Sequence, residues 1–135
     1  MANQGPLNME WAEPLPPACP PEEAKAPNGE QYYRLVETFP PTEHDFYSYR
    51  MLYPQRPFKL GECIARAVSI FTSHEECRKL KKLPRFKNKN DTVVSLILPS
   101  DSGVVLQTGR DHSHFSWWRW RTFNPIPRCQ KAGVE

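Results

Sequence analysis

The chain has 135 residues, with 18 Lys and Arg against 15 Asp and Glu, and it contains 15 Pro and 4 Cys. A chain of this length has room for one domain, which buries roughly two-thirds of the surface that the unfolded chain exposes. No apolar run approaches the ~20 residues that cross a bilayer, and the segment from Met1 to Pro6 has no basic or apolar signal region. We therefore expect no membrane partner and a cytoplasmic location.

The first 30 residues differ in composition from the rest. They hold seven of the prolines and a net charge of −4, which leaves +7 for residues 31–135. Proline fixes φ and lacks a backbone donor, so we expect a Pro-rich acidic arm over 1–30 that is extended or disordered. The arm could have no role of its own. Three other roles remain open: Trp11 could dock back on the domain, the acidic arm could shield a basic surface, or Trp11 could anchor a protein partner.

The first predicted elements follow an Asn28-Gly29 turn signal. Residues 31–37 combine aromatic and β-branched side chains, which is typical of a strand. Thr42 with an acid three positions later predicts a helix start, and Phe46 and Tyr49 would share the buried face of a helix of about two turns.

A second strand and helix are predicted next. Residues 67–71 alternate as a short strand, whereas 63–66 is ambiguous. Ser73 and Glu76 form a capping box that begins a helix with Cys77 and Leu80 on its inner face, and Pro84 ends this helix.

The remaining segments predict strands. Residues 91–98 are apolar enough for a central strand, 99–103 form a turn, 104–108 return antiparallel to that strand, and 114–123 add another. The fold class expected is α+β, with a small, mostly antiparallel sheet of about four or five strands, two short helices and the N-terminal arm. The domain would span 31–128, followed by a C-terminal tail over 129–135.

The strongest charge signal is a basic segment over residues 78–89, which holds seven basic residues and no acid. Such a density attracts phosphates, although most charge runs are only solvated faces. No recognition motif accompanies it. The side chains predicted to contact a nucleic acid or another polyanion are Arg78, Lys79, Lys81, Lys82, Arg85 and Lys87.

The most unusual stretch is aromatic and lies between residues 110 and 121. In a strand, His112 and His114 would point to one face, where paired imidazoles could bind a metal or carry out acid–base chemistry on a phosphodiester. Arginine beside tryptophan also suits stacking on nucleic-acid bases. The alternative to all of these functional roles is a structural strand whose tryptophans close the core. The contact residues predicted here are Trp117, Trp118, Arg119 and Arg121.

The cysteines at 19, 63, 77 and 129 contain no C-x-x-C pair, which excludes a zinc ribbon or thioredoxin motif. We expect no disulfide in a cytosolic chain, a core position for Cys77, no bound metal and no bound cofactor.

A further pattern joins two distant segments, Tyr33-Arg34 and Ser69-Ile70-Phe71-Thr72-Ser73. Over about a third of the chain this order resembles small ADP-ribosyltransferase toxins, including the RES type. The resemblance implies that Arg34 contacts the phosphates of a nicotinamide dinucleotide and that Ser69 or Thr72 faces the ribose. Those enzymes usually have a late glutamate that orients the ribose, whereas after Glu76 this chain has only the terminal Glu135.

The sequence therefore leaves three functional hypotheses. The leading hypothesis is a soluble binding domain whose basic, aromatic-rich surface contacts an anionic partner. The rival is a small enzyme with Arg34, His112 and His114 as catalytic residues, of the ADP-ribosyltransferase type or acting on phosphodiesters. The third is an accessory subunit that docks through the arm.

Overall fold

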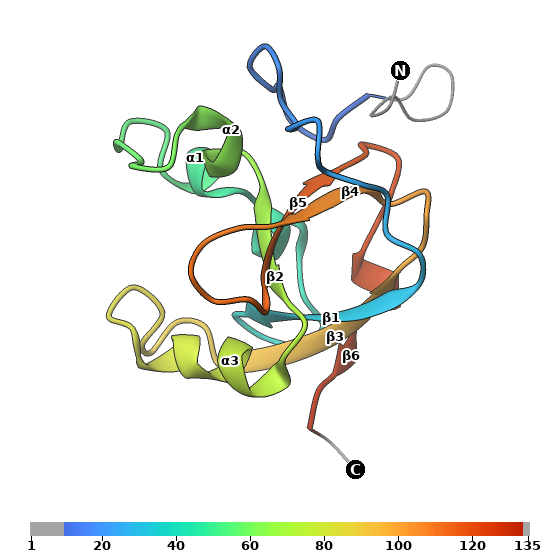
Figure 1. Cartoon of the computed structure of the whole chain (residues 1–135). Helices are drawn as coiled ribbons and strands as arrows, with labels where there is room; N and C mark the ends of the chain where they lie inside the picture. The colour runs from blue at the N-terminus through green and yellow to red at the C-terminus, as the bar shows by residue number, and fades with distance from the viewer. Residues whose placement is uncertain (1–9, 134–135) are drawn as a thin grey trace.

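A computed structural model describes residues 10–133 and contains one antiparallel sheet (Figure 1). Its six strands follow the order β4-β5-β2-β1-β3-β6 across the sheet. The strands are β1 (Glu30–Val36), β2 (Val68–Phe71), β3 (Thr92–Leu98), β4 (Gly103–Gln107), β5 (His114–Arg119) and β6 (Gln130–Lys131). An α+β fold with an antiparallel sheet is thus present, with six strands instead of the four or five expected.

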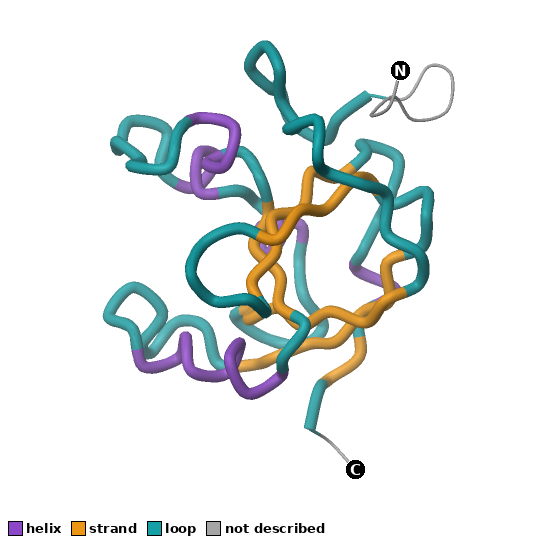
Figure 2. Tube along the Cα trace, in the orientation of Figure 1, coloured by secondary structure: helices purple, strands orange, loops and turns teal. Residues whose placement is uncertain are grey.

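The helices are short and lie outside the sheet (Figure 2). They are α1 (Tyr49–Leu52), α2 (Glu62–Ala65) and α3 (His74–Arg78), with 3-10 turns η1 (Glu43–Phe46), η2 (Lys79–Lys82) and η3 (Ile126–Arg128). Within residues 10–133, no helix has the length and apolar character that a membrane crossing requires.

The predicted caps locate two of these elements. The Ser73 hydroxyl accepts a hydrogen bond from the Glu76 amide at 3.2 Å, so α3 begins where the capping box predicts, and Cys77 is fully buried on its inner face. The start predicted at Thr42 is confirmed, because η1 begins there with a capping box between Thr42 and Asp45. The two-turn length is wrong, because the chain breaks at Tyr47 in an extended conformation and starts again at α1.

The pairing predicted for β4 is also wrong. All seven residues of β1 pair with β3, and β6 takes positions on the other edge of β3. The chain leaves β3 through Gly103, whose φ of 135° is open only to glycine and brings β4 against β5. Because β6 lies within residues 129–135, the expected C-terminal tail supplies an edge strand.

The sheet curls so that β4 and β5 lie across the core from β1 and β3 (Figures 1 and 2). One buried cluster joins side chains from these strands, among them Val36, Leu96 and Trp117. This curvature gives the sheet a filled inner face.

The arm packs on the domain over the residues described, 10–29. The rings of Trp11 and Trp120 stack with centroids 3.8 Å apart, and Lys25 pairs with Val105 beside the sheet. Trp11 therefore docks back on the domain, as one of the three alternatives expects. Residues 1–9 and 134–135 lie outside the described part.

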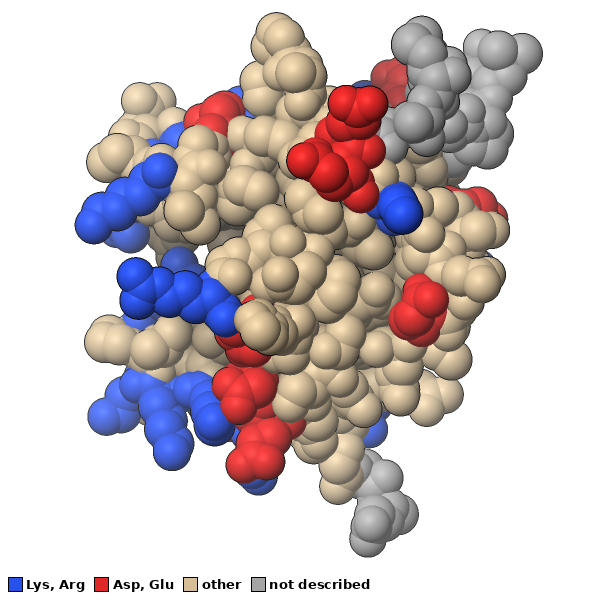
Figure 3. All heavy atoms as spheres, in the orientation of Figure 1, with Lys and Arg blue, Asp and Glu red and all other residues tan. Residues whose placement is uncertain are grey.

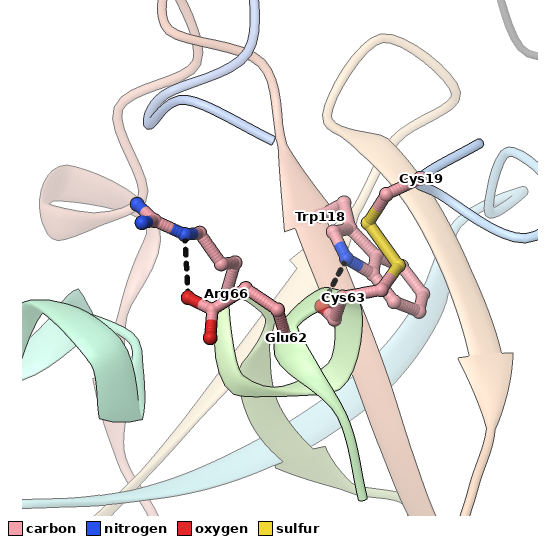
Figure 4. The surroundings of a disulfide bond; sticks show 5 residues. All are labelled: Cys19, Glu62, Cys63, Arg66 and Trp118. Atoms are coloured by element: carbon pink, nitrogen blue, oxygen red, sulfur yellow. Dashed lines mark hydrogen bonds and ion pairs between the residues drawn. A yellow bond between two sulfur atoms is a disulfide. The ribbon is translucent and has the colours of Figure 1, made fainter. Parts of the chain in front are cut away.

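A disulfide joins the arm to α2 (Figure 4). Cys19 and Cys63 are bonded, and the indole N–H of Trp118 donates to the Cys63 carbonyl at 3.0 Å. The expectation of no disulfide is wrong, because folding brings together two cysteines that are 44 positions apart in the sequence. Such bonds persist in oxidising compartments and are rare in the cytosol.

Candidate functional site: a cleft over strands β1, β2 and β5

A cleft of about 500 Å³ opens over β1, β2 and β5. Arg34, Ser69 and His114, one from each of these strands, line it together. One wall comes from the segment of α1 and α2 and the other from the residues that follow α3. Figure 3 shows Lys and Arg side chains gathered around a recess on this side of the molecule.

Arg34 lies at the floor of the cleft. Its Nε donates to the Asp45 carbonyl at 2.7 Å, its Nη1 donates to the Ser69 carbonyl at 2.6 Å, and its guanidinium lies 5.8 Å from the Phe46 ring centroid. Burial lowers the pKa of Arg34 to about 10, which still leaves it charged at neutral pH.

No carboxylate within residues 10–133 forms an ion pair with Arg34. The carboxylate of the nearby Asp45 accepts instead from the backbone amides of Glu37 and Thr42, each at 2.9 Å. Arg34 is therefore a fixed cation that two backbone carbonyls orient toward a cleft, an arrangement suited to an anionic group.

Ser69 and His114 are hydrogen-bonded to each other. The Nε2 atom of His114 lies 3.0 Å from the Ser69 hydroxyl, although the two residues are 45 positions apart. On its other side, Nδ1 lies 3.0 Å from the Thr108 carbonyl. The Phe71 ring packs edge-to-face with the imidazole, with centroids 5.1 Å apart, and this contact restricts rotation of the imidazole.

The wall from residues 49–65 is aromatic. Tyr49 packs against Tyr53 and Phe58, with ring centroids 5.1 and 4.8 Å apart. Arg50 holds this wall to α2 through two hydrogen bonds to the Glu62 carboxylate, at 2.9 and 3.0 Å. The wall thus lines the cleft with three aromatic side chains, one of which, Tyr53, also stacks under the Arg56 guanidinium at 4.4 Å, and Arg50 braces it from behind.

The opposite wall carries part of the basic segment. Arg85 and Lys89 are exposed and line the cleft, together with Phe86. Lys79 pairs with Glu76 at 2.7 Å and lies outside the cleft lining. The other predicted basic contacts, Arg78, Lys81, Lys82 and Lys87, also lie outside the lining.

The aromatic contact residues predicted on β5 are core residues. Trp117 and Trp118 are 0% and 1% exposed, so neither ring can stack on an external base. Arg119 donates to the Phe123 carbonyl and pairs with Glu43. Arg121 is exposed and pairs with Glu10 at 2.8 Å. The two rings lie on opposite faces of β5: Trp117 belongs to the cluster that fills the curled sheet, whereas Trp118 belongs to a second cluster that Leu15 and Cys19 of the arm help to cover.

The two histidines predicted to act together are separated. His114 begins β5 and lines the cleft, whereas His112 lies in the preceding turn, exposed and outside the lining. The alternation that would pair them needs a strand through both, and β5 starts too late. Among residues 10–133, no three His, Cys, Asp or Glu side chains gather as metal ligands do.

The two free cysteines are buried. Burial raises the pKa of the Cys77 thiol to about 12 and that of Cys129 to about 11. Both thiols are therefore protonated at neutral pH and are poor nucleophiles.

Sequence reasoning missed the aromatic wall and the partnership of Ser69 with His114. The spacing of Tyr49 and Tyr53, four positions apart, was the available signal for the wall. Nothing in the sequence connects Ser69 with His114. Comparison with protein-family models, curated proteins and solved structures finds no match in any of the three.

Proposed function

We propose that this chain is a small enzyme whose cleft binds a nucleotide of the nicotinamide dinucleotide type and transfers or hydrolyses its ADP-ribosyl group. The observation that carries the proposal is the meeting of Arg34 with Ser69, whose carbonyl accepts from Nη1 at 2.6 Å. These residues are 35 positions apart, and each belongs to one of the two segments that resemble ADP-ribosyltransferases.

The chemistry of the walls supports the same ligand class. A dinucleotide carries a pyrophosphate and two heteroaromatic rings, and the cleft combines Arg34, which has no ion pair within residues 10–133, with the aromatic side chains of Tyr49, Tyr53 and Phe58. The volume of about 500 Å³ falls within the range of small-molecule sites. Thr72 lies outside the lining, which favours Ser69 as the hydroxyl beside the ribose.

The late glutamate of the resembled enzymes has no counterpart on β5, where His114 lines the cleft. Two earlier carboxylates line the cleft, Glu37 and Asp45. Asp45 is buried and bonded to backbone amides, whereas Glu37 is exposed, with a carboxylate oxygen 3.7 Å from Nδ1 of His44. Glu37 is therefore the carboxylate that we expect to meet a ribose hydroxyl.

The test measures NAD⁺ binding by calorimetry and nicotinamide release by chromatography. Replacing a charge-assisted hydrogen bond costs about 1.5–3 kcal/mol, so Arg34→Gln should weaken binding about 10- to 100-fold. Arg34→Lys keeps the positive charge but loses the planar, multiply donating guanidinium, and we expect an intermediate loss of NAD⁺ affinity. Arg110→Gln, an exposed arginine outside the cleft, is the matched control.

Unfolding curves of each variant separate a lost contact from a lost fold. Equal NAD⁺ affinity in the wild type, Arg34→Gln and Arg110→Gln would contradict the proposal. Release of a nucleoside monophosphate in place of nicotinamide would instead assign hydrolysis of the pyrophosphate to the cleft.

A second candidate function is contact with a polyanion along the basic segment. The observation that favours it is that Arg85 and Lys89 stand exposed at the cleft mouth. A nucleic acid strand on this side would reach the cleft, and each phosphate contact adds about 0.7 to 0.9 to the slope of log affinity against log salt concentration. Arg85→Gln with Lys89→Gln should lower that slope, whereas Lys25→Gln, on the arm, should not. Unchanged slopes would refute this contact.

A further inference from the structure

Ser69 and His114 form the only hydrogen-bonded hydroxyl–imidazole pair lining the cleft within residues 10–133. Ser69 lies on β2 and is exposed, and His114 begins the neighbouring strand β5. Because both side chains rise from paired strands, their separation is set by the sheet and not by a loop.

The surroundings of the imidazole determine which nitrogen carries the proton. The Thr108 carbonyl, 3.0 Å from Nδ1, can only accept, so Nδ1 is the protonated nitrogen of the neutral ring. Nε2 then presents its lone pair to Ser69 at 3.0 Å, and the serine hydroxyl donates to it. A base oriented by a third group and bonded to a hydroxyl is the arrangement of an activated nucleophile.

The Thr108 hydroxyl completes the network. It lies 3.2 Å from Nδ1 and 2.8 Å from the Ser116 hydroxyl, which is buried behind the pair. These contacts and the packed edge of Phe71 hold the ring in one orientation.

We propose that Ser69 is a nucleophile, that His114 is its general base, and that Ser69 forms a covalent adduct with the electrophilic centre of a ligand anchored at Arg34. The natural substrate in this proposal rests on the proposed function. The nucleophile–base pair itself rests on the geometry of Ser69, His114 and Thr108.

On the proposed ligand the step balances as follows. The Ser69 oxygen attacks C1′ of the ribose that carries nicotinamide, and an O–C1′ bond forms while the C1′–N bond breaks. The electron pair goes to the ring nitrogen, which leaves as neutral nicotinamide, and the serine proton moves to Nε2 of His114. Water or an acceptor hydroxyl then attacks C1′, the bond to Ser69 breaks, His114 returns its proton to Ser69, and the attacking oxygen releases its proton to solvent. Two displacements retain the configuration at C1′.

The closing experiment treats the full chain with a fluorophosphonate, in which an activated serine displaces fluoride from phosphorus. Peptide mapping should locate the label on Ser69, and Ser69→Ala should remove it. General-base assistance is worth about 10²- to 10⁴-fold, so His114→Gln should slow labelling at least about 100-fold. Thr72→Ala and His112→Gln are the matched controls, because both positions are exposed and lie outside the cleft.

Each outcome decides the matter. A wild-type chain without label on Ser69, or equal labelling rates in the wild type and His114→Gln, would overturn the pair.

A second sample is incubated with NAD⁺ and its intact mass is measured. Labelled Ser69 without nicotinamide release keeps the pair and rejects the proposed function. Nicotinamide release without labelling, and with Ser69→Ala still active, keeps the proposed function and rejects the pair. If a variant unfolds, mapping the wild-type label still decides the nucleophile.

Discussion

The disulfide between Cys19 and Cys63 makes a quantitative prediction about stability. It closes a loop with a sequence separation of 44, and cross-linking a loop of that size removes chain entropy worth about 4 kcal/mol from the unfolded state. The arm keeps its other contacts when the bond is absent, namely the Trp11–Trp120 stack and the pairing of Lys25 with Val105. We therefore expect reduction to lower the free energy of unfolding by up to about 4 kcal/mol while the native fold persists.

The assay is urea unfolding followed by tryptophan fluorescence, on the oxidised chain, the reduced chain and the Cys19→Ser/Cys63→Ser variant. The reduced chain and the variant should unfold at similar urea concentrations, well below the oxidised chain. Reductant should leave the double variant unchanged, which controls for effects on Cys77 and Cys129. Alkylation that captures four free thiols in the untreated chain, or a difference below about 1 kcal/mol, would refute the reasoning.

Two further predictions concern single residues. Gly103→Ala should destabilise the fold by about 2 kcal/mol or more, because its φ is 135° and a Cβ would collide with the β5 backbone. Gly61→Ala, where a Cβ would stand in open space, should cost only about 1–2 kcal/mol. Equal losses of stability for the two variants in thermal melts would contradict this prediction. Burial raises the pKa of Glu13 above 4.5 despite its hydrogen bond from Ser48, so its contribution to stability is present below pH about 4.5 and is lost as pH rises through the raised pKa. Glu13→Gln should therefore gain stability relative to the wild type between pH 4 and pH 8, and an equal difference at both pH values in urea melts would show that the carboxyl does not titrate with folding.

The cleft brings together two features that seemed unrelated in the sequence. Arg85 and Lys89, from the basic segment, stand at its mouth, and Arg34 lies at its floor. An anionic ligand entering the cleft therefore meets positive charge at both depths. The binding and enzymatic hypotheses thus share one surface. The Arg34 variants test the floor of the cleft, and the double variant of Arg85 and Lys89 tests its mouth.

Local chemistry made several elements predictable. The capping serine at position 73, the β-branched segment over 92–98 and the short strand over 68–71 act over a few residues, and each appears where it was expected. Arg34 was also singled out from its strand. The helix predicted after Thr42 is shorter than expected because η1 ends at Phe46 and Tyr47 takes an extended conformation that no local signal required.

The sequence by itself determined the strands β1 to β5, the α3 cap, the charge division and the presence of Arg34 and His114, since these depend on residue type and near neighbours. The tertiary structure alone decided that β4 pairs with β5, that Trp117 and Trp118 are core, that Cys19 meets Cys63, and that His114 partners Ser69 and not His112. The physical reason is that these outcomes depend on the curl and strand order of the sheet, which bring together residues 44 or 45 positions apart.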